Sequence, residues 1–150
     1  MRSARFWAGV GWGVVATIAM SIVMILAMLA GVSPMPKPIP IALVARTLGE
    51  GIPKPVLMAL GIVLHLGYGG LFGGLLAIST RAVTVLKALA LGVGLWLLMQ
   101  VLWLPYLGWG VFGTNLTPKI AVATLVLHLI YGGTLGALAD RHVATAPVAA

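Results

Sequence analysis

Four uninterrupted apolar stretches constrain the fold of this chain more than any other feature of its sequence. They are Phe6 to Ala30, Leu57 to Ser79, Leu86 to Gly108 and Ile120 to Ala139, and apart from Lys87 they contain no Asp, Glu, Lys or Arg. An α-helix of about 20 residues crosses the roughly 30 Å of hydrocarbon in a bilayer. Lipid cannot satisfy exposed backbone groups, and the stretches lack the short alternating segments of β-barrel strands. They therefore predict four transmembrane helices.

The composition agrees with a membrane protein and excludes several other classes. Of the 150 residues, 61% are hydrophobic and 7% are charged, whereas a water-soluble domain usually carries about 25% charged residues. Disordered chains need low hydrophobicity and high charge. The absence of cysteine excludes disulfides, thiolate metal sites and thiol catalysis. We expect a single all-α integral membrane domain over residues 1–150.

The cations lie in the connections and tails, and they predict the orientation of the chain. Five are expected on one side of the membrane and four on the other: Arg2, Arg5, Arg81, Lys87 and Arg141 against Lys37, Arg46, Lys54 and Lys119. The positive-inside rule favours both termini in the cytoplasm, with the chain in the inner (plasma) membrane. Because the net charge of +7 is divided between two sides, the expected partner is the lipid bilayer and not nucleic acid.

The connection between the first two stretches contains a further short element. Six prolines between residues 31 and 56 exclude one continuous helix. Between them, Ile39 to Gly49 is apolar, with Arg46 and Glu50 four residues apart. We expect a short helix here, lying on the outer membrane interface.

The second and fourth stretches share a pattern that indicates an internal repeat. Residues 65–75 and 128–138 both read H-L-x-Y-G-G-x-x-G-x-L without a gap, and Val63-Leu64 matches Val126-Leu127 just before them. The halves, residues 6–79 and 86–139, are then two helical hairpins. Because the matched helices run in the same direction, the halves should be related by an axis along the membrane normal.

Glycines of this repeat recur every four residues and therefore share a helix face with a histidine. The two sets are His65, Gly69 and Gly73, and His128, Gly132 and Gly136. Such G-x-x-x-G spacing lets two backbones approach closely. We predict that the second and fourth helices meet at their glycine faces, or that one of them packs against a second copy of the protein. Alternatively, a flat cofactor or substrate lies against the glycine surface.

Polar side chains from all four helices are expected at one depth in the membrane. Counting the helical rise places His65, His128, Gln100 and Ser21 near the bilayer centre, with Tyr68 and Tyr131 about one turn deeper. Polar residues are costly inside a membrane, so a functional site is the default interpretation of such a layer.

Three interpretations of this layer remain open. In the first, neutral histidines hold helices together in a non-enzymatic accessory or scaffold subunit without cofactor, in a homo-oligomer or a larger membrane complex. In the second, His65 and His128 ligate one haem b in an electron-transfer subunit, the glycines seat the porphyrin, and Lys54 and Lys119 meet its propionates. In the third, the layer is the midplane site of a small transport or permeation unit. The lack of an acidic residue within the spans weakens coupled transport.

Enzymatic interpretations have less support from the sequence. It contains no paired carboxylates, no H-E-x-x-H motif and no glycine-rich phosphate loop with lysine. Glu50 and Asp140 are the only acidic residues, whereas a catalytic metal site usually includes a carboxylate ligand or an acidic group beside the ligands. We expect neither catalysis nor a metal ion.

Two motifs carry a resemblance to a known group of proteins. They are Leu107-Gly108-Trp109-Gly110-Val111-Phe112-Gly113 and His128-Leu129-Ile130-Tyr131-Gly132-Gly133. Together with a first span rich in small residues and methionine, they resemble a family of small prokaryotic four-helix membrane proteins of unknown function. The similarity covers most of the chain. It implies the four-helix fold and no activity.

Overall fold

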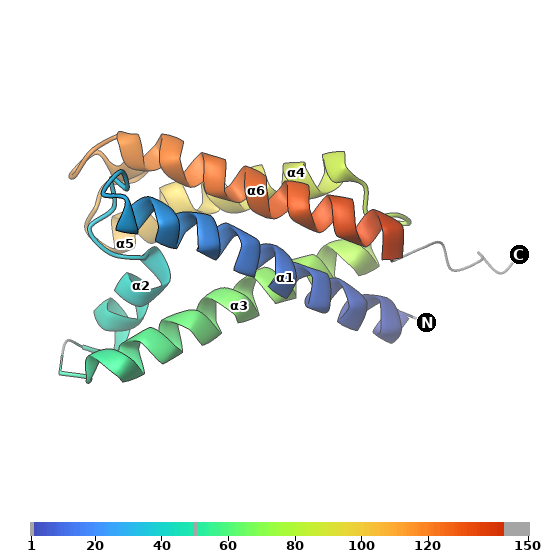
Figure 1. Cartoon of the computed structure of the whole chain (residues 1–150), viewed down its shortest axis with the longest axis horizontal. Coiled ribbons are helices and arrows are strands. Elements are labelled where there is room, and N and C mark those ends of the chain that lie inside the picture. Colours follow the sequence, from blue (N-terminus) through green and yellow to red (C-terminus); the bar gives the residue numbers. More distant parts are fainter. Residues whose placement is uncertain (1, 50, 143–150) are drawn as a thin grey trace, which may run out of the picture.

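The computed structural model describes residues 2–49 and 51–142, with side chains as far as Asp140, and this part of the chain contains helices and no strand. The long helices are α1 (Arg2–Leu29), α3 (Lys54–Ser79), a third span over Val85–Tyr106, and α6 (Lys119–His142) (Figure 1). All four are long and apolar enough to cross a membrane. The prediction of an all-helical chain with four such helices is confirmed.

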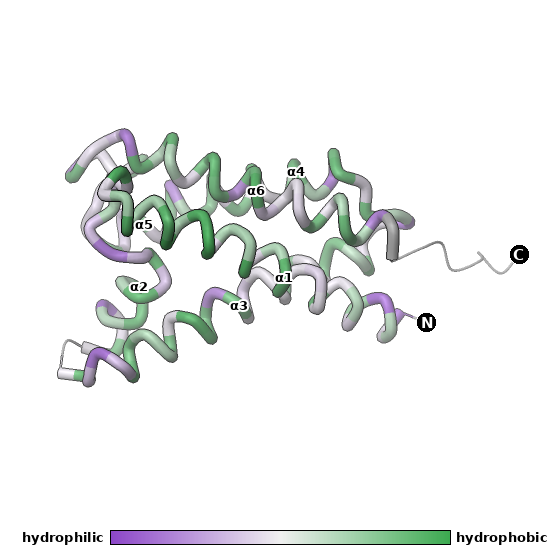
Figure 2. The backbone as a smooth tube through the Cα atoms, viewed as in Figure 1, coloured by the Kyte–Doolittle hydropathy of each residue, from purple (hydrophilic) through white to green (hydrophobic). Residues whose placement is uncertain are grey.

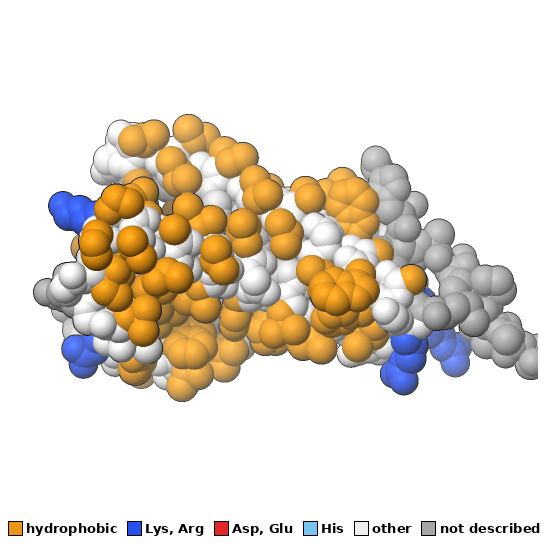
Figure 3. All heavy atoms as spheres, turned by 90° about the horizontal axis from the view of Figure 1, so that it is seen from below, with side chains coloured by type: hydrophobic (Ala, Val, Ile, Leu, Met, Phe, Trp, Pro, Cys, Tyr) orange, Lys and Arg blue, Asp and Glu red, His pale blue; other side chains and the backbone are white. Residues whose placement is uncertain are grey.

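The outside of the molecule is apolar along most of its length. Leu29 and Leu86 are 80% and 78% exposed. Hydrophobic residues run along every long helix in Figure 2, and Figure 3 shows hydrophobic side chains over the middle of one face with Lys and Arg only near the two ends. A surface of this kind is unfavourable in water and suits contact with lipid.

The third span is interrupted by a wider helical turn. It consists of α4 (Val85–Leu98), a π-helical segment η1 (Met99–Trp103) and α5 (Leu104–Tyr106). Pro105 has no N–H, and its ring would clash with the carbonyl of Val101 in a regular α-helix. In η1 the N–H of Leu104 instead bonds to the carbonyl of Met99, five residues back, which accommodates the proline. Gln100 lies within this segment and is fully buried.

Glycines form the closest contacts within two pairs of helices, α1 with α3 and α4 with α6. A β-carbon on Gly73 would lie 2.9 Å from the Cα of Gly13 in α1, and one on Gly132 would lie 2.6 Å from the carbonyl oxygen of Ala88 in α4. Gly136 likewise faces Val85. No other residue type allows backbones to come this close.

The structure therefore corrects the predicted contact between the glycine faces of the second and fourth helices. Helices α3 and α6 share few contacts, and each glycine face is covered by the preceding long helix of the chain. The spacing of glycines defines which residues share a face of a helix, but it does not specify which helix covers that face.

The two helix pairs join mainly along α1 and α6. Tyr131, on α6, is 2% exposed, and its hydroxyl donates a 2.6 Å hydrogen bond to the carbonyl oxygen of Gly69 on α3. This bond reaches from the second pair into the first at the level where the first pair is most tightly packed. Tyr131 is therefore a structural link between the two pairs.

The short helix expected in the first connection is present as α2 (Ile39–Leu48), with Pro40 in its first turn. It does not lie apart from the bundle. Ile39 and Ala42 are buried, the side chain of Ile41 packs against Gly61 of α3, and Thr47 bonds to the Tyr106 hydroxyl at 3.1 Å. Glu50, the expected partner of Arg46, lies outside the described residues. The side chain of Arg141, one of the cations used for the orientation, is also outside them.

Arg5 links the start of α1 to the end of α3. Its guanidinium donates hydrogen bonds to the carbonyl oxygens of Ala77, Thr80 and Arg81, at 2.7 to 3.2 Å. The carbonyls of Ala77 and Thr80 belong to the last turn of α3 and its C-cap, where backbone acceptors lack partners within the helix. This cation therefore satisfies a helix end as well as contributing to the charge balance of the chain.

We expect Gly132→Ala to lower the free energy of unfolding by about 1–3 kcal/mol, because the added methyl group would displace the backbone of α4. The matched control is Gly133→Ala, where a β-carbon meets no atom within 4 Å and alanine improves helix propensity. Titration of the purified protein with SDS, followed by circular dichroism, measures both variants. Equal losses would contradict the assignment of Gly132 to the interface.

Candidate functional site

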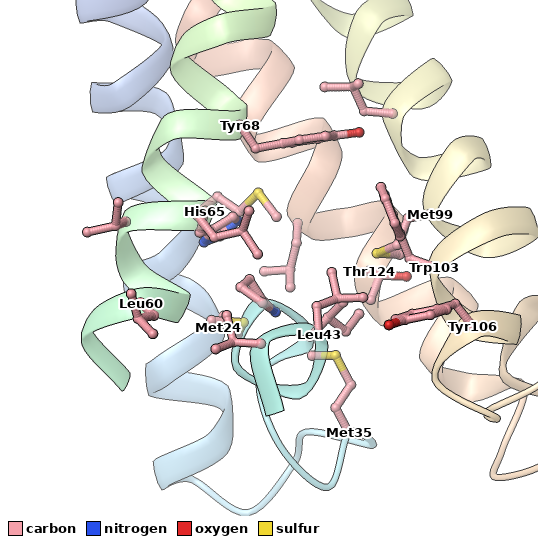
Figure 4. Close-up of a pocket in the computed structure, with 18 of the residues that line it drawn as sticks. Met24, Met35, Leu43, Leu60, His65, Tyr68, Met99, Trp103, Tyr106 and Thr124 are labelled. Atoms are coloured by element: carbon pink, nitrogen blue, oxygen red, sulfur yellow. The ribbon is translucent and has the colours of Figure 1, made fainter. Parts of the chain in front are cut away.

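A cavity of about 610 Å³ lies between α3 and the third span. Helix α6 and residues of α1 form its back, and α2 closes one end (Figure 4). Its walls are mostly apolar and include several methionines: Met20, Met24, Met35 and Met99. Methionine side chains are flexible and adapt to irregular shapes. The cavity is therefore a deformable apolar space inside the bundle.

The cavity exists because α3 is held close to α1 along only half of its length. The glycines of α3 that contact α1 lie between Gly69 and Gly74, in its second half. Toward its first residue, α3 diverges from α1, and α2 occupies the space between them (Figure 1). Helices α3 and α4 share few contacts, so the cavity is bounded on that side by partly exposed residues such as Leu64, which is 43% exposed.

Tyr68 places an unpaired hydroxyl group in this cavity. The oxygen is buried and makes no hydrogen bond of ordinary length in the described part of the chain. The indole N–H of Trp103 approaches it as a donor, and because an indole cannot accept, the proton of the Tyr68 hydroxyl has no acceptor. In Figure 4 the ring extends from α3 with its hydroxyl directed across the cavity, where Met99, Trp103 and Tyr106 of the third span lie on the opposite side. An unpaired buried hydroxyl costs about 1–3 kcal/mol.

Two histidines line the same cavity and keep one ring nitrogen free. The Nδ1 of His65 lies 3.2 Å from the Ser21 hydroxyl, and the Nδ1 of His128 lies 2.8 Å from the carbonyl oxygen of Thr124. A carbonyl only accepts, so Nδ1 of His128 carries the proton and donates, which leaves Nε2 of the neutral ring as an acceptor. Neither Nε2 has a hydrogen-bond partner among the residues that the structure describes.

Gln100 lies beside the cavity in a buried pair with Thr124. Its amide nitrogen donates to the Thr124 hydroxyl at 2.9 Å, and that hydroxyl donates to the carbonyl oxygen of Ile120 at 2.7 Å. The amide oxygen of Gln100 is buried without a partner in the described residues. The pair joins the π-helical turn to α6, and it supports the segment that carries His128.

The expected polar layer is thus brought together only in part. His65, His128 and Tyr68 share the cavity, and Ser21 and Gln100 support it from outside. Tyr131 and the glycines of the repeat, Gly69, Gly73, Gly132 and Gly136, do not line it. A porphyrin could not lie on those glycines, because α1 and α4 cover them. Lys54 and Lys119, the expected partners of haem propionates, are also absent from its lining.

Several contributors to the cavity were missed in the sequence. Thr124 stands one helical turn before His128 in an otherwise apolar span, and this spacing was a usable signal. Pro105 within the third stretch could have indicated the π-helical turn. No pattern in the sequence indicates that Met35 and residues of α2 line the cavity. The described residues contain no group of three or more His, Cys, Asp or Glu side chains that could hold a metal ion.

Comparison with known proteins places the chain in a family. The profile of a family of unknown function, DUF6789, matches residues 3–148. The chain belongs to the DUF6789 family. This agrees with the resemblance to small membrane proteins of unknown function. No curated protein and no solved structure matches the DUF6789 chain.

In this DUF6789 chain we expect Thr124→Val to be more destabilising than Gln100→Leu. Valine leaves the buried Gln100 amide nitrogen without an acceptor, which costs about 1–3 kcal/mol, whereas leucine removes both polar atoms of the amide and leaves Thr124 bonded to Ile120. The midpoints of SDS-induced unfolding measure the difference. If Gln100→Leu proves the more damaging variant, the amide contributes through a bond that this pair does not contain.

Proposed function

We propose that this chain is a multi-pass protein of the inner (plasma) membrane, with both termini cytoplasmic, and that it binds an apolar small molecule in the cavity between α3 and α4. The Tyr68 hydroxyl, whose proton has no acceptor in a largely apolar cavity, carries this proposal. A buried polar group without a partner is unfavourable, and a ligand that supplies the partner removes this cost.

The apolar surface and the separation of charges support the membrane location. Four helices are long enough to span a bilayer, and the cations gather near the two ends of the molecule (Figure 3). Gly69 and Gly132, which match in the sequence repeat, each contact the preceding long helix. These equivalent contacts support two hairpins related by an axis along the membrane normal. Helix α2 then lies at the outer end, within the bundle.

The size and position of the cavity support a ligand from the bilayer. Its volume of about 610 Å³ is within the range of small-molecule sites, about 300–1,000 Å³. Val63, at its margin on α3, is 67% exposed and would face lipid in a membrane. An apolar molecule could then enter sideways through the gap between α3 and α4 without crossing water.

The scaffold interpretation depended on glycine faces that are free to bind a partner subunit. The glycine faces that could have received a partner subunit are occupied within the chain. A carrier or permeation role would use the same cavity and remains compatible with ligand binding. We propose binding alone, with no catalytic step.

We expect the protein purified from its host membrane to retain an apolar compound, and Leu43→Trp to lower this retention by narrowing the cavity. Leu43 projects into the cavity from α2 (Figure 4). The control is Val122→Trp, which adds the same side chain at a position on α6 that is 67% exposed and does not line the cavity. Native mass spectrometry and solvent extraction measure the retained compound. Equal retention by both variants, or none by the unaltered protein, would refute the proposal.

Haem b is a second candidate ligand, favoured by the free Nε2 atoms of His65 and His128 in one cavity. Protein made with haem supplied should then show a sharp α-band after reduction with dithionite. His65→Ala and His128→Ala should each remove this band, while Ser21→Ala should only shift it. A flat spectrum from folded protein would eliminate haem and leave the apolar ligand.

A further inference from the structure

We infer that the ligand of the cavity is an isoprenoid quinol, held by its ring hydroxyl groups between Tyr68 and His128. This inference rests on the proposed function and names the class of ligand. It follows from the donors and acceptors that the cavity offers, from the charge of its walls and from its aromatic side chains.

Among the hydrogen-bonding groups of the cavity, Tyr68 offers an unpaired donor and His128 an unpaired acceptor, beside the free Nε2 of His65 and the indole N–H of Trp103. The hydroxyl of Tyr68 has no acceptor for its proton. Nε2 of His128 has a lone pair and no donor, because the proton of the neutral ring is on Nδ1, bonded to Thr124. A ligand hydroxyl both accepts and donates. Hydroxyl groups on one ring can therefore satisfy both side chains.

The charge of the walls excludes several other lipids. No Lys, Arg, Asp or Glu side chain lines the described cavity. A phosphate or carboxylate head group would be buried there without a counter-ion, which is strongly unfavourable. This argues against phospholipids and fatty-acid anions, and it applies equally to the two propionates of haem. A neutral head group fits the cavity.

The aromatic side chains favour a flat ring over an aliphatic alcohol. Tyr68 projects from α3 and Trp103 from the third span into the same cavity, and the Trp103 indole N–H approaches the Tyr68 hydroxyl (Figure 4). Aromatic rings interact favourably with other rings in stacked or edge-on arrangements. The remaining walls are aliphatic or methionine side chains, which suit an isoprenoid tail. The gap between α3 and α4, at Val63 and Leu64, gives that tail a route into the surrounding lipid.

This hydrogen-bonding pattern predicts a preference for the reduced ligand. A quinone carbonyl accepts from Tyr68 but cannot donate to His128, whereas a quinol hydroxyl does both. One additional hydrogen bond that satisfies a buried acceptor corresponds to about tenfold in affinity. We therefore expect the quinol to bind about tenfold more tightly than the quinone.

The test is a competition between decylubiquinol and decylubiquinone, in equal amounts and without oxygen, for the full chain in lipid nanodiscs. After gel filtration, the bound compounds are extracted and quantified by chromatography. Tyr68→Phe should weaken both forms about fivefold and leave their ratio unchanged, because both accept from Tyr68. His128→Phe should bring the ratio close to one. Tyr131→Phe is the matched control: its hydroxyl bonds to Gly69 outside the cavity, so binding per folded protein should not change.

The outcomes distinguish failure of the quinol from failure of the proposed binding function. A ratio near one in the unaltered protein, or a preference for the quinone, would overturn the inference without any variant. If the protein retains another apolar compound but binds neither form of the probe, the quinol is wrong and the proposed function stands. If it retains nothing from its host membrane and binds neither form, both are wrong.

Discussion

Backbone contact at glycine is the interaction on which the shape of this molecule depends. Where glycines of α3 meet Gly9 and Gly13 of α1, the two helices touch without intervening side chains. The first half of α3 has only Gly61 at an interface, and that glycine receives Ile41 of α2 rather than α1. The close contact therefore ends partway along the helix, and α3 diverges from the bundle. Tight packing at one end and an apolar cavity toward the other are two results of the same uneven distribution of glycine.

The sequence predicted where the helices form better than it predicted which helices pack against one another. Uncharged stretches of sufficient length mark membrane-spanning helices, and the four long helices overlap the four stretches. The positions of His65 and His128 predicted a common depth, with Tyr68 about one turn deeper, and the structure places all three around one cavity. The helix that covers each glycine face could not be predicted, because a periodic pattern defines a face and not its partner. The cavity lies where α3 and α4 do not contact each other. A local sequence pattern cannot predict that two helices will not be in contact.

The matched tyrosines show that similar sequence motifs have different roles in the two halves. Tyr131 reaches across to the first helix pair and bonds to the carbonyl oxygen of Gly69, whereas Tyr68 is unpaired in the cavity. The matched histidines differ as well, since one bonds to Ser21 of another helix and the other to the backbone of its own. The second copy of the motif mainly connects the bundle, and the first supplies a side chain that remains available.

The order of contacts along the chain has a consequence for biogenesis. Each glycine interface joins long helices that are successive in the sequence, and Arg5 ties the start of α1 to the end of α3. The first hairpin therefore contains all the residues it needs for its own closure once about residue 81 has left the ribosome. The second hairpin does not need the first in order to close. The seam between α1 and α6, with the bond from Tyr131 to Gly69, can form only after the last helix has been inserted. Assembly of the hairpins in sequence and their lateral docking in the bilayer would then be separate steps, and the cavity would be completed in the second.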